Sequence, residues 1–414
     1  MSLINSSHAI LAEYLKDQPD QQPSFARDGP QEFPANAPQH VNTARQNLVS
    51  AARDLQLLAL YPTEAVHYLG LEALGKMSLQ FITHFNIPSH IPLDSSISYT
   101  TLSQKLSIPE SRLTRILRHA ILTHHIFHEP SPGQIAHTSI SAALLSSKSV
   151  ADVLYDWMYP GMPAIVKATE KFGAKAEESG NEAMGLVLGG GENGEWGWAS
   201  LPQDFTGVFA EYMKASVEGT TIKQVVSGWN WRGLGEGGVV VDVGGNVGHI
   251  GTAIAEAAPE LRVVVQDLAE AVRLGEKQLP DHLKGRVSFM EHDFFKPNPI
   301  QGASVYFFSR IIHDWNDEKS VVILKNVATA MDPKLSKIIL CEKIMPAEPG
   351  KIPQYQETFM RNLDLAMMMM NGAERTMEQW KQLVDTADVG LRISDVVQPE
   401  GSLASLIVLE KVAS

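Results

Sequence analysis

The sequence VVVDVGGNVGHIG, residues 239–251, determines the architecture expected for the second half of the chain, because an unbroken apolar run passes directly into a glycine turn. The run is typical of a buried β-strand, and the residues after the turn are typical of a helix. Further apolar runs follow, with helical segments between most of them, at residues 262–266, 287–290, 305–308, 337–340 and 406–409. Strands that are apolar throughout indicate a sheet covered on both faces. The second half is therefore predicted to be an open α/β domain.

Three glycines, Gly244, Gly245 and Gly248, stand where this first strand passes into the helix. Glycine there lets a ligand approach the backbone and leaves the N–H groups of the helix N-terminus free to bind polar groups. The second strand ends in Asp267, about 20 residues beyond the turn, where a carboxylate can accept hydrogen bonds from two ribose hydroxyls. Asn246 stands where the dinucleotide-binding fingerprint requires glycine. The turn therefore favours some nucleoside-bearing ligand over a tight turn that binds nothing.

Candidate functional side chains also follow the later strands. Asp293 ends the third strand, where a carboxylate could accept from an adenine amino group while Phe294 lies against the ring. His313 comes just after the fourth strand, at the edge where open α/β sheets bind their ligands. Glu342 follows the fifth strand, and Glu374 stands ahead of a helix. Carboxylates beside an imidazole fix its tautomer and stabilise the imidazolium, as a general base requires.

The combined motifs resemble those of plant and fungal S-adenosylmethionine-dependent O-methyltransferases of the caffeic-acid type. They are DVGG with a later glycine, a strand ending in DL, a strand ending in HD and phenylalanine, then HDW, a glutamate after the next strand, and ERT. The resemblance covers roughly residues 95 to 412, and the combination is highly specific. It implies a Rossmann-like methyltransferase domain preceded by a mainly helical winged-helix dimerisation domain.

Carried over position by position, the resemblance assigns a cofactor site and a substrate site. His313 is implied as the general base that takes a proton from a phenol or enol oxygen of a small natural product, with Glu342 and Glu374 flanking it. The residues implied to bind S-adenosyl-L-methionine are Gly244, Gly245, Gly248, Asp267, Leu268, Asp293, Phe294 and Trp315. Those implied to contact the small-molecule substrate are Asp314, Met213, Met367, Met370 and Asn371. No metal site is predicted, because the donor supplies the leaving group and the protein supplies alignment and a base.

The chain is expected to contain four parts. Residues 1–40 are rich in Gln and Pro and are predicted to form a flexible N-terminal arm. Residues 41–150 are predicted to form a helical domain. Within that domain two helices and a Pro-Gly hairpin outline a winged helix, and its long apolar helices predict a homodimer. Residues 151–235 are expected to hold linker helices and the Gly-rich insertion Gly185 to Trp198. This insertion is either a mobile surface loop or a lid or cavity wall that carries Trp196 and Trp198. Residues 236–414 form the methyltransferase domain.

Composition excludes several other classes of protein. The 414 residues include 34 Lys and Arg against 47 Asp and Glu, a net charge of −13 that opposes nucleic acid and anionic membranes. Residues 95–150 carry five basic and two acidic side chains, a local charge of +3. The rest of the chain then carries −16, and this charge would oppose the binding of DNA by a winged helix. A single cysteine, Cys341, excludes an internal disulfide framework and a Cys-based zinc cluster. No run spans a bilayer and no signal-peptide pattern is present, so a soluble, cytoplasmic protein is expected.

Two other enzyme classes are alternatives to methyl transfer for these motifs. Some fungal members of the family bind S-adenosylmethionine yet catalyse dehydration or pericyclic cyclisation, so retained motifs do not fix the reaction. An NAD oxidoreductase is disfavoured by Asn246 and by the absence of a separate hydride-transfer constellation. The complete set of His313, Glu342 and Glu374 favours methyl transfer.

Overall fold

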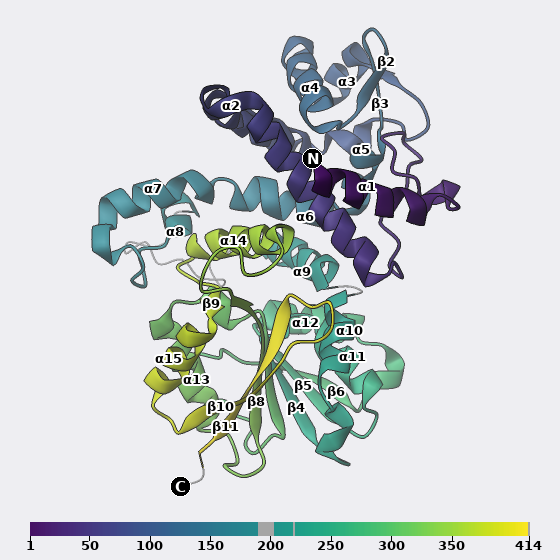
Figure 1. Cartoon of the computed structure of the whole chain (residues 1–414). Helices are drawn as coiled ribbons and strands as arrows, with labels where there is room; N and C mark the ends of the chain where they lie inside the picture. The colour runs from purple at the N-terminus through teal and green to yellow at the C-terminus, as the bar shows by residue number, and fades with distance from the viewer. Residues whose placement is uncertain (189–202, 218–219, 413–414) are drawn as a thin grey trace. The chain divides into compact units, whose positions relative to one another are not determined.

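The computed structural model describes residues 1–188, 203–217 and 220–412. It divides into two compact units. The first comprises Met1–Tyr159 with Pro353–Gln356, and the second Pro160–Ile352 with Glu357–Ser414. The expected fold class is confirmed, because a helical N-terminal region precedes a mixed α/β sheet domain (Figure 1).

The first unit is built on a long helix, α2 (Gln39–His84), against which α1 (Ser2–Leu15) packs. The helical conformation of α2 breaks at Tyr61, whose φ is 54°. Pro62 follows directly, and it explains the break because proline lacks an N–H donor and restricts the residue before it. The sequence pattern did not predict α1, which forms inside the segment expected to be an arm.

Two helices and a small antiparallel sheet complete most of this unit. Helices α3 (Tyr99–Leu106) and α4 (Glu110–His124) precede the hairpin of β2 (His128–Ser131) and β3 (Gln134–Ala136). Strand β1 (Ile97–Ser98) pairs with β3, which gives the strand order β1-β3-β2. The order helix, helix, hairpin is the one that the sequence predicted. The buried apolar core here includes Leu79, Ile82, Leu102, Leu113, Leu117 and Ile135. The unit also contains α5 (Ser139–Ser146), α6 (Lys148–Ala151) and a π-helix, η3 (Asp152–Met158).

The second unit is organised around one mixed sheet with the order β10-β11-β8-β7-β4-β5-β6. Strands β6, β5, β4, β7 and β8 run parallel, whereas β11 and β10 are antiparallel to their neighbours. The main strands are β4 (Val239–Val243), β5 (Arg262–Asp267), β6 (Val287–Glu291), β7 (Val305–Ser309), β8 (Lys337–Met345), β10 (Leu391–Val397) and β11 (Ala404–Lys411). A two-residue strand, β9 (Arg375–Thr376), pairs with the end of β8.

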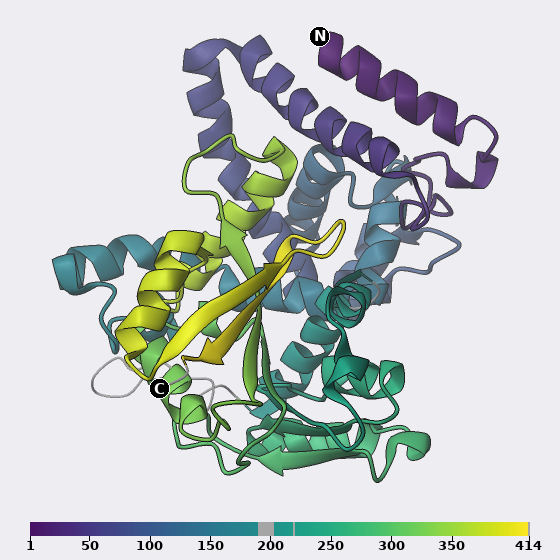
Figure 2. The same ribbon diagram turned by 60° about the horizontal axis from the view of Figure 1, so that its bottom comes forward.

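The sequence predicted six of the seven main strands of this sheet and missed β10. Its residues are mostly exposed because it forms the edge of the sheet, so it has no continuous apolar run for a sequence pattern to detect. Figure 2 shows the C-terminal hairpin of β10 and β11 in yellow. Pairing of β11 with β8 adds this hairpin to the parallel strands.

Helices cover both faces of the sheet, as the continuous apolar strands predicted. Adjacent residues of β7 enter different cores, because successive strand side chains point to opposite faces. Tyr306 joins the core beneath α13 and α15, and Phe307 joins the one beneath α10 and α11. The helices of this unit are α7 (Gly161–Phe172), α8 (Ala183–Leu188), α9 (Gln203–Val217), α10 (Thr220–Gly228), α11 (His249–Ala257), α12 (Ala269–Gln278), α13 (Asp317–Ala328), the greater part of α14 (Gln354–Met368) and α15 (Met377–Ala387).

The structure describes only part of the Gly-rich insertion. The Gly-rich insertion was expected from Gly185 to Trp198, and its part from residue 189 onward, with Trp196 and Trp198, lies outside them. Among the helices that are described, none is long and apolar enough to cross a membrane.

Candidate functional site

The glycine turn after β4 adopts a backbone that few residue types tolerate. Gly244 and Gly248 have φ values of 70° and 82°, and Asn246 between them has a φ of 53°. Asparagine is among the few non-glycine residues that adopt the left-handed region readily. Asn246 therefore takes a conformation that glycine adopts most readily.

The turn is also tightly packed from below and from the side. A Cβ on Gly244 would lie 2.6 Å from Cδ1 of Ile311, and one on Gly245 would lie 2.6 Å from Cγ of Asp242. Asp242 is buried beneath the turn and accepts a hydrogen bond from the Gly251 N–H at 3.0 Å. Burial raises the pKa of this carboxyl to about 7. A side chain at either position would force its neighbours to move.

Asp267 joins the tip of β5 to the turn. Its Oδ2 accepts from the backbone N–H of Asn246 at 2.8 Å, and its Oδ1 accepts from the N–H of Leu268 at 2.7 Å. Burial raises the pKa of Asp267, and these two donors oppose the rise by stabilising the carboxylate. Each oxygen retains a second lone pair, so the carboxylate can still accept from ribose hydroxyls. Leu268 is 40% exposed beside it.

The aromatic residues predicted for the adenine region lie close to the same turn. The Cε1 atom of Phe294 is 3.7 Å from the position that a Cβ on Gly244 would take. The Phe294 ring meets Trp315 edge to face, with centroids 5.9 Å apart. Oδ1 of Asp293 accepts from the Phe295 N–H at 3.0 Å, which fixes that carboxylate at the end of β6. The structure thus brings Gly244, Phe294 and Trp315 together, and the contact of Phe294 and Trp315 with adenine stays a prediction.

His313 lies in a short 3-10 helix, η8 (Ile312–Asp314), directly after β7. Its imidazole is only 5% exposed. Nδ1 is 2.8 Å from Oε1 of Glu374 and 3.7 Å from Oε2 of Glu342. Nε2 lies 3.5 Å from Oδ1 of Asp314. The sequence placed His313, Glu342 and Glu374 in one site, and the structure brings all three together.

The two glutamates are held differently. Oε1 of Glu342 accepts from the N–H groups of Ile311 and Ile312 at 3.0 and 2.9 Å, so Glu342 supports the backbone that leads to His313. Glu374 instead makes the direct hydrogen bond to the ring, and its own N–H donates to Asp364 at 2.9 Å. The Oε2 atoms of both glutamates are buried with no hydrogen-bond partner in the described structure.

This clustering of carboxylates changes the protonation of every member. Burial disfavours the imidazolium of His313, but Glu342, Asp314 and Glu374 outweigh burial and raise its pKa to about 9. Burial raises the pKa of Glu342 and raises that of Asp314 to about 7. Burial also opposes ionisation of Glu374, but its hydrogen bond with His313 prevails and lowers its pKa. The site therefore favours a positively charged imidazole.

Two further residues beside His313 were not assigned from the sequence. Tyr212 of α9 interacts electrostatically with Arg310 and Asp314, and burial raises its pKa. Arg310 has a φ of 56°, and its N–H donates to the Cys341 carbonyl at 3.2 Å. The motifs in the sequence assign no role to either residue.

The residues predicted to contact the substrate lie in η8, in the helices α9 and α14, and in the turn after α14. Met367 and Met370 are buried, and Met369 between them also packs inward, whereas Met368 is 39% exposed. Asn371 has a φ of 58°, and its side-chain amide donates to the Glu178 carbonyl at 3.0 Å. Met213 lies on α9, one residue after Tyr212. The assignment of these side chains to a substrate stays a prediction.

Among the described residues, no group of three or more His, Cys, Asp or Glu side chains has the arrangement of a metal site.

The chain is similar in sequence to known O-methyltransferases. A family model for the O-methyltransferase domain matches residues 181–389. The "Hps1-dma1 cluster O-methyltransferase" of Dothistroma septosporum is 37% identical over 380 residues, covering 90% of this chain and 86% of the relative. The "O-methyltransferase pgmB" of Aspergillus terreus is 34% identical over 421 residues, covering 99% of this chain and 94% of the relative.

Solved structures share the fold at lower sequence identity. The crystal structure of OxaC aligns with a TM-score of 0.81 at 21% identity, covering 99% of both chains. The structure of LepI in complex with SAM aligns with a TM-score of 0.73 at 18% identity, also covering 99% of each. These likenesses concern the fold alone. The sequence relatives extend over nearly the whole chain, and with the matching family model they show that the chain belongs to the O-methyltransferase family.

Proposed function

We propose that this protein transfers a methyl group from S-adenosylmethionine to a phenol or enol oxygen of a small natural product, with His313 as general base. The observation that carries the proposal is the buried imidazole of His313, held by two glutamates at the sheet edge where the glycine turn and Asp267 also lie. S-adenosylmethionine supplies a methyl group bound to a positively charged sulfur. The fungal relatives named O-methyltransferases, and the OxaC structure in complex with SAH and oxaline, support this assignment.

The residues around the glycine turn fit that cofactor. The Gly244 position is open only because it lacks a Cβ, and the Phe294 ring lies beside it. Asp267 has lone pairs available for ribose hydroxyls. The side-chain oxygen of Asn246 is buried and has no hydrogen-bond partner in the described structure, so it is a ready acceptor at the same place. Leu268, Asp293 and Trp315 complete the proposed cofactor residues.

Proton transfer follows from how the imidazole is held. Nδ1–H donates to Glu374, which leaves the lone pair on Nε2 to accept a proton. When bound, S-adenosylmethionine would supply the methyl group and leave as S-adenosylhomocysteine, and Nε2 of His313 would take the proton of the acceptor hydroxyl. The products are a methyl ether, S-adenosylhomocysteine and a proton held by His313 until it passes to solvent. Glu342 and Glu374 stabilise the imidazolium formed. We further propose that the acceptor contacts Asp314, Met213, Met367, Met370 and Asn371.

The proposed reaction is tested by incubating the protein with methyl-labelled S-adenosylmethionine and a panel of polyphenols and polyketides. The label is expected in an O-methylated product, with one S-adenosylhomocysteine formed for each transfer. Conversion of a substrate without S-adenosylhomocysteine would overturn the proposal in favour of cyclisation or dehydration.

Asp267→Ala is expected to weaken binding of S-adenosylhomocysteine by about 1–3 kcal/mol, because the ribose hydroxyls lose their acceptor inside a buried site. Asp267→Asn keeps one acceptor oxygen and should fall between this variant and the wild type. Calorimetry measures the affinity without requiring turnover. Asp281→Ala removes an aspartate whose side chain is 92% exposed and serves as the control. Unchanged affinity in Asp267→Ala would show that another group holds the ribose.

We also propose that the first unit contains a winged helix and forms a homodimer. Helix α2 exposes large apolar side chains along both of its halves, and clusters of this kind on a protein surface commonly mark an interface. They are Leu55, Leu58, Val66, Leu69, Leu71, Leu74 and Met77. The groove beside this helix adds Phe81, Phe85 and Ile116.

Light scattering is expected to give about twice the chain mass of 45.4 kDa at micromolar concentration. The double variant Leu58→Glu, Leu71→Glu places two charges on the exposed apolar face and should yield a monomer. Leu335→Glu, at a site in the second unit that is 73% exposed, is the matched control and should remain dimeric. A wild-type protein that scatters as a clean monomer contradicts the proposal.

A further inference from the structure

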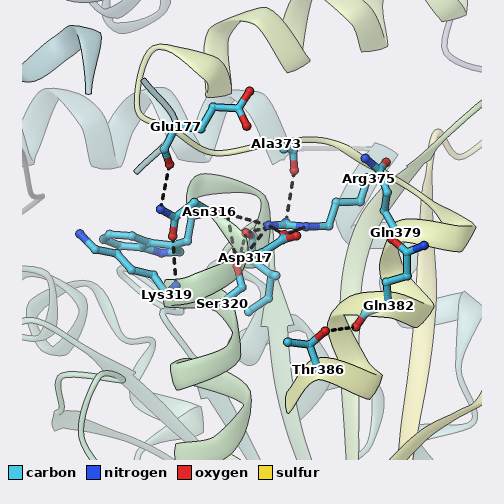
Figure 3. Close-up of polar contacts among 12 residues, drawn as sticks. Glu177, Asn316, Asp317, Lys319, Ser320, Ala373, Arg375, Gln379, Gln382 and Thr386 are labelled. Carbon is cyan, nitrogen blue, oxygen red and sulfur yellow. Dashed lines mark hydrogen bonds and ion pairs between the residues drawn. The ribbon is translucent and has the colours of Figure 1, made fainter. Parts of the chain in front are cut away.

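Arg375 places a buried guanidinium against the loop that carries His313. Its side chain is 2% exposed although it is charged. Nη1 donates to the carbonyl of Ile312 at 3.1 Å, and Nη2 donates to the carbonyl of Trp315 at 2.8 Å. Figure 3 shows Arg375 directed toward the start of α13, where Asp317 and Ser320 lie. The guanidinium therefore holds the backbone on both sides of His313.

The residues just before Arg375 hold the same loop at its centre. The Ala373 N–H donates to the carbonyl of His313 at 2.9 Å. A Cβ on Gly372 would lie 2.2 Å from that carbonyl oxygen, so the close approach of the two backbones requires glycine there. Glu374, which lies between Ala373 and Arg375, contacts the imidazole itself. One short segment thus fixes both the ring of His313 and the backbone that carries it.

The ion pair of Arg375 does not by itself explain why a cation is buried here. Its carboxylate partner, Asp317, accepts at 2.9 Å from Nε and at 2.7 Å from Nη2, but the Asp317 side chain is 73% exposed. An ion pair with one partner in water contributes little to stability, and a buried charge is costly unless its donors are satisfied. The guanidinium also lies over the Trp380 ring at 5.4 Å. The remaining donors are satisfied by neutral acceptors: the carbonyls of Ile312 and Trp315, with longer bonds to the Ala373 carbonyl at 3.4 Å and Oγ of Ser320 at 3.3 Å.

We propose that Arg375 is a positioning residue for the general base, which keeps the imidazole of His313 within hydrogen-bond distance of Glu374 by clamping the carbonyls of Ile312 and Trp315. The proposal rests on the proposed function for its kinetic consequence, whereas its structural consequence concerns His313 alone. The planar fork of arginine matters, because lysine has one ammonium group and cannot bridge two carbonyls with the same geometry.

Arg375→Lys is expected to lower kcat by roughly 10–10²-fold, the cost of misplacing a catalytic group by about an ångström. The affinity for S-adenosylhomocysteine should stay within about twofold, because the glycine turn and Asp267 are untouched. NMR titration of ¹⁵N-labelled histidine should show a lower pKa for His313, since its bond to Glu374 weakens. Arg273→Lys, at an exposed arginine of α12, is the matched control and should change none of these values.

A double-variant cycle separates positioning from a general effect on folding. In the His313→Gln background, Arg375→Lys should cause almost no further loss of kcat, because residues that act as a unit are not additive. An equal loss in both backgrounds, or a titration of His313 that does not move, would overturn the proposal.

The titration needs no turnover, so failure of methyl transfer would leave this test of Arg375 intact. If Arg375→Lys does not fold, Gly372→Ala displaces the same loop through the His313 carbonyl and should give the same two signatures, a lower kcat and a lower His313 pKa.

Discussion

His313→Gln is expected to lower kcat by roughly 10²–10⁴-fold, the range for loss of a general base. Glutamine fills much of the same volume but cannot accept a proton near neutral pH, so the acceptor hydroxyl must ionise unaided. Affinity for S-adenosylhomocysteine should stay within about twofold, because His313 lies outside the proposed cofactor contacts. Single-turnover kinetics and calorimetry measure the two quantities separately.

The pH dependence of the variant distinguishes base catalysis from a structural effect. With a phenolic acceptor, His313→Gln should regain part of its activity at high pH, since hydroxide then ionises the phenol. His282→Gln, at an exposed histidine far along the chain from His313, is the matched control and should behave as wild type. Full product formation by His313→Gln would contradict the role of His313 as base. If the protein also converts its substrate without forming S-adenosylhomocysteine, the result would favour cyclisation.

The functional residues that could be predicted from the sequence are those that stand at the end of a strand. Asp267 and His313 follow apolar strands, and parallel strands place such residues at one edge of the sheet. The structure confirms that His313, Glu342 and Glu374 meet, although Glu374 is 61 positions away from His313. No periodicity could supply that contact, and it came from the resemblance to a family.

The residues that were missed act through tertiary contacts without a local signature. Arg375 was quoted only as part of a motif, because nothing in ERT shows that its guanidinium is buried against carbonyls near residue 313. Strand β10 was missed for the opposite reason, since an exposed edge strand lacks the apolar run that marks the others. The raised pKa of His313 also depends on three carboxylates from different segments, which a sequence does not place at defined distances.

Glu374→Gln is expected to change both the height and the position of the pH–rate profile. The wild-type rate should rise with pH as His313 loses its proton, because only the neutral imidazole accepts one. The midpoint is expected between the ordinary imidazole pKa of 6.5 and about 9, since a bound sulfonium opposes the carboxylates that raise it. Removing the charge of Glu374 removes one cause of the rise, so the midpoint moves to lower pH. The maximum rate should nevertheless fall by roughly 10²–10⁴-fold, because the glutamine amide can donate its NH₂ group to Nδ1 and so stabilise the tautomer whose Nε2 already carries the proton.

Glu342→Gln provides the matched comparison, because it removes the same charge from a different position. Its effect on the midpoint should have the same sign, since the Glu342 carboxylate also raises the pKa of His313. The amide oxygen of glutamine can still accept from the N–H groups of Ile311 and Ile312, and the direct bond to Nδ1 comes from Glu374. The fall in maximum rate should therefore be much smaller than in Glu374→Gln. A midpoint that moves to higher pH in either variant would mean that the titrating group is not an imidazole held by carboxylates. Equal losses of maximum rate would mean that charge, rather than the hydrogen bond at 2.8 Å, is what Glu374 contributes to His313.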